Sequence, residues 1–146
     1  MLAAGGLVAC GADAGSSTPS LSPASPEFRA LALVVHDDLG LLSTHNLGSS
    51  ASSCVAGGND VECRGWLQDR VDAIDAFAHD AASLTVTPDV KAALDPLMSS
   101  LQQWRSFAGQ ILPNFNNGGR LAELEIQMDD VGAQIGSSIH AISGDN

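Results

Sequence analysis

Residues 120–142, RLAELEIQMDDVGAQIGSSIHAI, carry the clearest periodic pattern in the chain. Apolar side chains recur there at alternating steps of three and four positions, at Leu121, Leu124, Met128, Val131, Ile135, Ile139 and, less strictly, Ile142. An α-helix takes about 3.6 residues per turn, so this spacing places these side chains on one face. The stretch therefore predicts an amphipathic helix that packs against other helices in a bundle.

The segment from about residue 25 to 47 is predicted to form the first helix. It opens with Ser25-Pro26-Glu27, which supplies an N-capping hydroxyl, a proline at the first helical position and an acid in the first turn. Its apolar stripe consists of Phe28, Leu31, Val35, Leu39 and Leu42, with Val34 and Leu41 widening it. This segment thus has both a start signal and a face to bury.

A second helix is predicted from Asn59 or Asp60 to about residue 84, since Asn59 and Glu62 fit a capping-box pattern. Its buried face is predicted to hold Cys63, Trp66, Leu67, Val71, Ile74, Phe77, Ala78, Ala81 and Leu84. A third helix is predicted over about 88–112, with Val90, Leu94, Leu97, Leu101, Trp104, Ala108 and Ile111 on one side. Because proline disfavours a helix interior, this helix is either kinked at Pro96 or preceded by a separate 88–94 piece.

These four amphipathic segments, without any alternating strand pattern, predict an all-α fold: an antiparallel four-helix bundle over residues 27–146. With 146 residues, the chain has room for one domain with a sizeable core. Aromatic residues make up only 4% of the chain, so the core is expected to be aliphatic. A break at Pro96 would turn the third helix into two.

The formal net charge of -11 disfavours two classes of partner, nucleic acids and anionic lipid surfaces. Nucleic acids are bound by clustered Lys and Arg, which this chain lacks. The same charge disfavours electrostatic adhesion to anionic lipid headgroups. Attachment to a membrane would therefore have to come from a covalent lipid.

Leu7-Val8-Ala9-Cys10 follows apolar or small residues and precedes a Gly/Ser/Pro-rich run. These four residues resemble the lipobox of bacterial lipoproteins. The resemblance implies that residues 1–9 are the remnant of a signal peptide and that Cys10 carries lipid such as palmitate. It also implies a flexible linker over 10–26 and an anchored position on the extracytoplasmic side of the cell membrane. The first basic residue is Arg29, so either translation starts upstream or the match is accidental.

Cys54 and Cys63 form the remaining pair of cysteines, nine positions apart. In an exported chain they are predicted to form a disulfide, whose small ring would contribute roughly 2 to 3 kcal/mol. Zinc binding is the alternative, but two thiols without clustered histidines make a poor site. The bridge would hold the loop of 48–62 at one end of the bundle as a contact surface.

Arg70 is the one charged residue near the centre of the apolar stripe of its helix. A buried guanidinium needs a partner. Asp38 lies nine residues from the end of its predicted helix and Arg70 about ten from the start of the next, which places them at similar heights in an antiparallel hairpin. We therefore predict an internal Asp38–Arg70 ion pair. The alternative is that the stem of Arg70 packs while its head reaches water.

No constellation in the sequence predicts catalysis or a resident cofactor. His79 and His140 fall away from their apolar stripes, and no two histidines are placed to clamp a haem. Asp72, Asp75 and His79, at i, i+3 and i+7, form a weak candidate for a divalent cation. Because elbow, P-loop and zinc-protease motifs are lacking, the chain is predicted not to be an enzyme.

The sequence therefore predicts a lipid-anchored, non-enzymatic binding module whose partner is an envelope protein or an external protein. One version of this function is a protein that blocks uptake or phage DNA injection at the cell surface. The alternative is a carrier or sensor for a metal or a small apolar ligand, with Pro96 as a hinge. A filled interior would favour the module, and a lined cavity of roughly 300 Å³ or more would favour the carrier.

Overall fold

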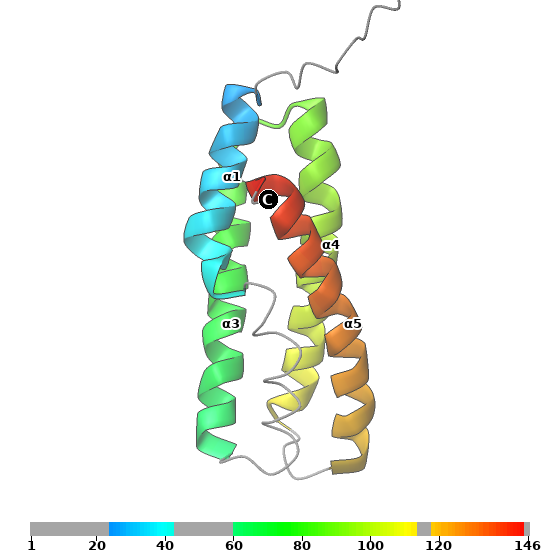
Figure 1. Cartoon of the computed structure of the whole chain (residues 1–146). Coiled ribbons are helices and arrows are strands. Elements are labelled where there is room, and N and C mark those ends of the chain that lie inside the picture. The colour runs from blue at the N-terminus through cyan, green and yellow to red at the C-terminus, as the bar shows by residue number, and fades with distance from the viewer. Residues whose placement is uncertain (1–23, 43–59, 114–117, 145–146) are drawn as a thin grey trace, which may run out of the picture.

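The structure, a computed structural model, describes residues 24–42, 60–113 and 118–144. These residues form four α-helices and one short 3₁₀ helix (Figure 1): α1 (Pro26–Leu39), η1 (Gly40–Leu42), α3 (Asp60–Ala81), α4 (Pro88–Ile111) and α5 (Gly118–Ser143). No strand occurs in these three ranges. The all-α prediction is confirmed.

The helices form an antiparallel bundle in which each one runs opposite to the next along the chain (Figure 1). α1 packs beside α3 and α5, and α4 completes the ring between α3 and α5. This is the arrangement that four amphipathic stripes require, because each apolar face then meets two neighbours. The described helices offer no segment long and apolar enough to cross a bilayer.

The helices differ in length, so they do not all extend along the whole bundle. α1 has 14 residues and α5 has 26. At a rise of about 1.5 Å per residue, these numbers correspond to about 21 Å and about 39 Å. α1 therefore accompanies only part of the bundle, the part near the C-terminal end of α3 and the start of α4 (Figure 1).

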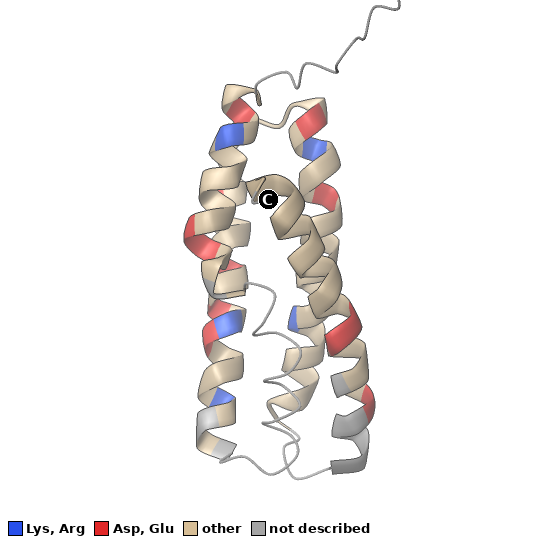
Figure 2. Cartoon of the chain, viewed as in Figure 1, with Lys and Arg blue, Asp and Glu red and all other residues tan. Residues whose placement is uncertain are grey.

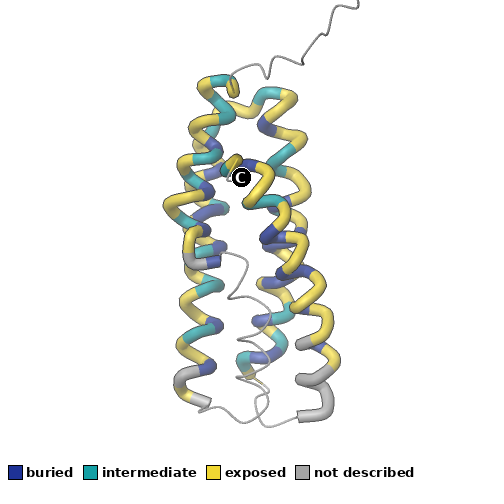
Figure 3. Tube along the Cα trace, viewed as in Figure 1, coloured by how far each residue is buried: buried dark blue, intermediate teal, exposed yellow. Residues whose placement is uncertain are grey.

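The interior is aliphatic, as predicted, with two large aromatic rings at its centre. Buried positions line the facing sides of the helices, while the outer sides are exposed (Figure 3). Every described member of the predicted stripes is buried or partly buried, and the core consists of Leu31, Val35, Leu39, Leu42, Leu67, Ile74, Phe77, Ala81, Val90, Leu97, Leu101, Trp104, Ala108, Ile111, Leu124, Met128, Val131, Ile135 and Ile142. Burial of this apolar surface is the main force that holds the bundle together.

A small polar network ties the starts of α1 and α4 together at one end of the bundle. The Ser25 hydroxyl accepts a hydrogen bond from the backbone N–H of Phe28 at 3.1 Å, which makes it the predicted N-cap of α1. The same hydroxyl donates to a carboxylate oxygen of Asp89 in the first turn of α4 at 3.0 Å. The Thr87 hydroxyl donates to the other carboxylate oxygen. These bonds lower the pKa of Asp89.

α4 runs through Pro96 without a break, so the alternative of a separate 88–94 helix is wrong. Pro96 supplies no N–H to the carbonyl of Ala92, but both residues are exposed, so water can take the place of the missing donor. Asp95 does not cap a new helix. Its carboxylate instead accepts a hydrogen bond from Lys91 at 2.5 Å, one turn earlier. Core packing on both sides of the proline outweighs its local cost.

Candidate functional site

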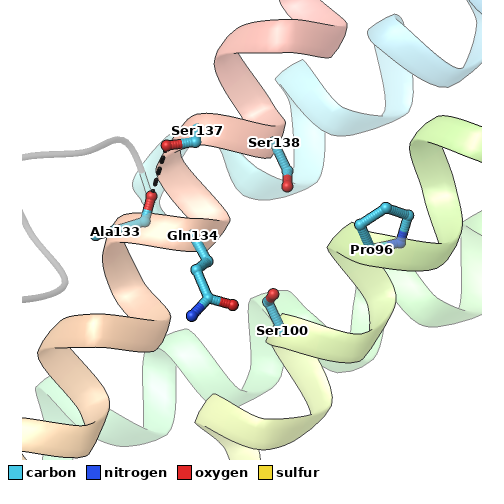
Figure 4. A pocket seen from close by; sticks show the side chains of 6 residues that line it. All are labelled: Pro96, Ser100, Ala133, Gln134, Ser137 and Ser138. Atoms are coloured by element: carbon cyan, nitrogen blue, oxygen red, sulfur yellow. Dashed lines mark hydrogen bonds between the residues drawn. The ribbon is translucent and has the colours of Figure 1, made fainter.

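A hollow of about 400 Å³ lies between α4 and α5 (Figure 4). α4 contributes its proline and a serine, while α5 contributes small and polar side chains. The lining residues are Pro96, Ser100, Ala133, Gln134, Ser137 and Ser138. Short side chains at these positions leave the space between the two helices unfilled, in contrast to the aliphatic contacts elsewhere in the bundle.

Ser100 forms the floor of the hollow. It is 7% exposed and is the one polar residue among the described segments that counts as buried. Its hydroxyl makes no hydrogen bond with any other described residue. In Figure 4 this hydroxyl points into the hollow, toward the side chains of Gln134 and Ser138. The hydroxyl oxygen is not among the polar atoms that are sealed from solvent, so water or a ligand in the hollow can pair with it.

The rim is formed by exposed residues of both helices, so the hollow is open to solvent on its outer side. Pro96, Ala133, Gln134 and Ser137 are all exposed. The Ser137 hydroxyl donates to the carbonyl oxygen of Ala133 at 2.9 Å, which leaves its oxygen lone pairs available as acceptors. The hollow therefore presents hydroxyl and amide groups above a buried serine.

The residues that line the hollow carry no formal charge, although Asp95 and Asp130 lie next to them along the two helices. No Asp, Glu, Lys or Arg occurs within 96–104 of α4 or within 131–143 of α5. Figure 2 shows the corresponding C-terminal part of α5 free of coloured residues. In a chain with a net charge of -11, this neutral zone is distinct from the acidic outer surface of α3.

Apolar periodicity in the sequence does not predict this hollow. Ser100 and Ser138 do not belong to an apolar stripe, and neither one forms a known motif. A usable signal was nevertheless present: two helical runs, 96–104 and 131–143, each lack charge and combine serine with glutamine. That composition is unusual for the exposed side of helices in such an acidic chain.

The predicted Asp38–Arg70 ion pair is not formed, and this prediction is corrected. The carboxylate oxygen Oδ2 of Asp38 is sealed from solvent and has no hydrogen-bond partner. Its pKa is raised by desolvation and by the negative charges of Asp80 and Asp37. Arg70 instead donates from Nη1 to the carbonyl oxygen of Trp66 at 3.1 Å. Asp38 is thus an uncompensated carboxylate.

Helix geometry explains why the two charged groups do not meet. Long side chains on a helix lean toward its N-terminus. α1 and α3 are antiparallel, so the heads of Asp38 and Arg70 lean in opposite directions. The guanidinium of Arg70 stacks on the ring of Trp66, with its central carbon 3.8 Å from the ring centroid. This cation–π contact replaces the predicted ion pair.

The ring of Trp66 also contacts the ring of Trp104, which lies on α4. Their centroids are 6.3 Å apart, with the planes tilted by 60°. Nε of Arg70 and Nε1 of Trp104 are both buried without hydrogen-bond partners. Desolvation lowers the pKa of Arg70. Trp66, Arg70 and Trp104 therefore connect α3 and α4 through contacts with aromatic rings, not through hydrogen bonds between side chains.

The weak metal candidate Asp72, Asp75 and His79 is not assembled into a site. Asp75 is bound by Arg105, and Asp72 accepts a hydrogen bond from the Gln68 amide at 2.8 Å. His79 is exposed. Across the described ranges, no three His, Cys, Asp or Glu side chains are grouped to hold a metal ion. Hydrogen bonds to neighbours occupy these carboxylates.

The histidine and cysteine predictions are only partly covered by the described residues. His79 and His140 are exposed, as their positions outside the stripes predict. Cys63 is 2% exposed and disulfide-bonded, and no other cysteine falls within the described ranges. The lipidation site Cys10, the linker, Cys54 and nearly all of the loop of 48–62 lie outside them. The Cys54–Cys63 pairing therefore stays a prediction.

Comparison of the chain with protein-family models, curated proteins and solved structures gives no significant match. Functional inference therefore depends on the residues of this chain. Among those that the structure describes, the hollow between α4 and α5 combines an open space with hydrogen-bonding side chains that lack partners. It is the candidate functional site.

Proposed function

We propose that this chain is a lipid-anchored binding module without catalytic activity, held on the extracytoplasmic side of the cell membrane. Lipid on Cys10 anchors the chain, and residues 10–26 separate the anchor from the bundle. The partner is an envelope protein or a protein that arrives from outside. Blocking of uptake or of phage DNA injection is one form that such binding takes at a cell surface.

The observation that carries the proposal is the combination of the lipobox-like sequence with a bundle whose apolar faces point inward. The large apolar side chains exposed among the described residues are Leu33, Val61, Val86 and Ile126. They lie on four different segments, so none of the described helices offers an apolar outer face to a bilayer. A covalent lipid supplies the membrane affinity that this surface lacks.

A bridge between Cys54 and Cys63 supports a binding role for the loop of 48–62. Cys63 is buried in the first turn of α3, which makes it a fixed attachment point for that loop. A disulfide-pinned loop loses less conformational entropy when it docks on a partner. The proposed contact surface is therefore the end of the bundle where α3 begins.

Photo-crosslinking in intact bacterial cells tests this proposal. A crosslinking amino acid is placed at position 56, inside the loop, and at the exposed position 82 near the opposite end of α3 as the matched control. We expect a discrete adduct from position 56 that disappears when Cys10→Ala removes the anchor. Equal adducts from both positions, or an adduct that is independent of Cys10, contradict a tethered module that binds through this loop.

The hollow between α4 and α5 favours a second candidate function, a carrier or sensor for a small ligand. Its volume of about 400 Å³ exceeds the size that a carrier was expected to show. Its lining contains three serines and a glutamine, however, and it lies outside the aliphatic core. Most of the lining surface is apolar, and these four side chains add hydrogen-bonding groups to it, so a carrier of this design takes a ligand with both polar and apolar parts. Saturable binding of a small polar molecule that occupies this hollow is the measurement that tests it.

A further inference from the structure

We propose that the hollow between α4 and α5 binds an uncharged, hydroxyl-rich molecule of the size of a neutral monosaccharide or disaccharide. This inference deepens the second candidate function, the carrier or sensor, and depends on it for its biological meaning. The hydrogen-bonding groups, the absence of charge and the size of the hollow each support this ligand class.

The hydrogen-bonding groups of the hollow match those of a sugar. A serine hydroxyl donates one hydrogen bond and accepts two, and a glutamine amide both donates and accepts. Ser100, Ser138 and Gln134 make no hydrogen bonds with other described residues, so all of these groups are available. Sugar hydroxyls also donate and accept at each oxygen. They can therefore pair with these side chains in more than one orientation.

Ser100 gives the site its specific requirement for a polar ligand. An apolar ligand that displaced water from the floor would leave this buried hydroxyl unsatisfied, at a cost in binding. A ligand hydroxyl placed there restores the bond that water makes in its absence. The position of Ser100 beneath the exposed rim makes it the deepest contact of the ligand.

The uncharged lining of the hollow disfavours strongly charged ligands, anions above all. A charged ligand loses hydration when it binds and needs a countercharge to offset that loss. None of the lining residues supplies one, and the adjoining residues Asp95 and Asp130 are acidic. The net charge of -11 also disfavours the approach of anions. A neutral ligand avoids both costs.

The remaining lining is apolar and suits the C–H faces of a sugar ring. The ring of Pro96 and the methyl group of Ala133 lie on opposite helices. The volume of about 400 Å³ falls in the range of small-molecule sites. Because the rim is exposed, contacts are made on one side of the ligand only. We expect a dissociation constant on the order of 1 mM.

Nuclear magnetic resonance titration of the full chain tests the inference, with Cys10→Ser used to keep the protein unlipidated. The probes are maltose and methyl glucoside, with glucuronate and glucosamine as charged counterparts. We expect saturable shifts of backbone amides in 97–100 and 133–138 with the neutral probes. Glucuronate, an anion, is expected to bind at least fivefold more weakly, and glucosamine is expected to bind no more tightly than the neutral probes.

Two variants locate the binding, with one matched control. Ser100→Ala removes the buried hydroxyl and is expected to weaken neutral-sugar binding about fivefold, the value of one lost hydrogen bond. Ala133→Trp fills the exposed rim and is expected to abolish binding. Ser99→Ala, at the adjacent exposed position outside the hollow, is expected to bind as the parent does. The helical content of each variant is checked by circular dichroism.

Three results would overturn the inference. One is the absence of saturable shifts with either neutral probe. Another is glucuronate that binds as well as the neutral probes, and the third is unchanged binding by both Ser100→Ala and Ala133→Trp. The unlipidated chain is used, so failure here leaves the proposal of a lipid-anchored module standing. Conversely, evidence against the lipid anchor in cells would not affect the sugar-binding measurement, because that measurement uses the unlipidated protein.

Discussion

The guanidinium of Arg105 on α4 donates two hydrogen bonds to the carboxylate of Asp75 on α3. The distances are 2.6 Å from Nε to Oδ1 and 2.9 Å from Nη2 to Oδ2. This bidentate geometry fixes both the spacing and the rotation of the two helices. The pair raises the pKa of Arg105 above its ordinary value. Both side chains are about half exposed, at 51% and 49%, so solvent screens the interaction.

A double-mutant cycle with Asp75→Asn and Arg105→Gln measures the coupling free energy between these two side chains. We expect a coupling energy of about 0.5 to 1 kcal/mol at low salt, because the pair is bidentate but exposed. The coupling should fall in 1 M salt. The Lys91–Asp95 pair, within one helix, serves as the control and should couple by about 0.3 to 0.5 kcal/mol. A coupling between Asp75 and Arg105 that does not exceed this control would show that the pair does not tie the helices.

Asp38→Asn is expected to stabilise the protein at neutral pH. The pKa of Asp38 is raised from 3.8, so the folded state keeps this proton to a higher pH than the unfolded state does. Its contribution to stability therefore falls as the pH rises from 3.8 through the folded pKa. Removing the charge should raise the free energy of unfolding by about 0.5 kcal/mol at pH 7, after allowance for solvent screening.

Urea unfolding of the parent protein and of Asp38→Asn at pH 7 and pH 3 tests whether the substitution raises the free energy of unfolding. At pH 3 the carboxyl group is protonated in both states, so the difference between the two proteins should vanish. An Asn variant that is less stable than the parent at pH 7 would indicate a favourable partner for the Asp38 carboxylate. That result would support an ion pair that involves Asp38, as the sequence predicted.

The contact between Arg70 and Trp66 should depend on the arginine stem more than on its charge. Arg70→Met keeps a long flexible side chain over the ring and removes the buried unpaired Nε. We expect its free energy of unfolding to stay within about 1 kcal/mol of the parent. Arg70→Ala loses the packing and should cost about 1 to 2 kcal/mol. Equal losses in both variants, measured by thermal unfolding, would assign the stabilisation to charge instead.

Pro96→Ala is expected to raise the thermal stability of the bundle. Alanine restores the backbone N–H that the Ala92 carbonyl lacks and has a far better helix propensity. Because proline also restricts the unfolded chain, we expect a net gain of about 1 to 2 kcal/mol. Ala92→Gly, at the same exposed face, should instead cost about 1 kcal/mol. A loss of stability in Pro96→Ala would show that the bundle requires the proline at this position.

Apolar periodicity predicted which segments form helices, because a helix in a bundle must bury a continuous stripe. It did not predict the end of the first one: α1 ends at Leu39 and a 3₁₀ helix follows, where a helix to about residue 47 was expected. The predicted stripe of residues 88–112 agrees with the structure from Val90 to Ile111. Polar pairing was harder to predict, since it depends on the register of helices joined by a long connection and on the direction in which each side chain leans. Asp38 and Arg70 show this limit, as does the pairing of Asp75 with Arg105. The hollow forms because short side chains leave space between two helices. The spacing of apolar residues in the sequence does not show where such a space occurs.

The helical fold and the hollow do not depend on the anchor, whereas the tethered role depends on it entirely. The most direct measurement is mass spectrometry of the N-terminal peptide of the mature protein isolated from bacterial membranes. The account predicts a chain that begins at Cys10 and carries fatty acyl groups. A mature chain that retains residues 1–9 with an unmodified Cys10 would contradict the account of a lipid-anchored module.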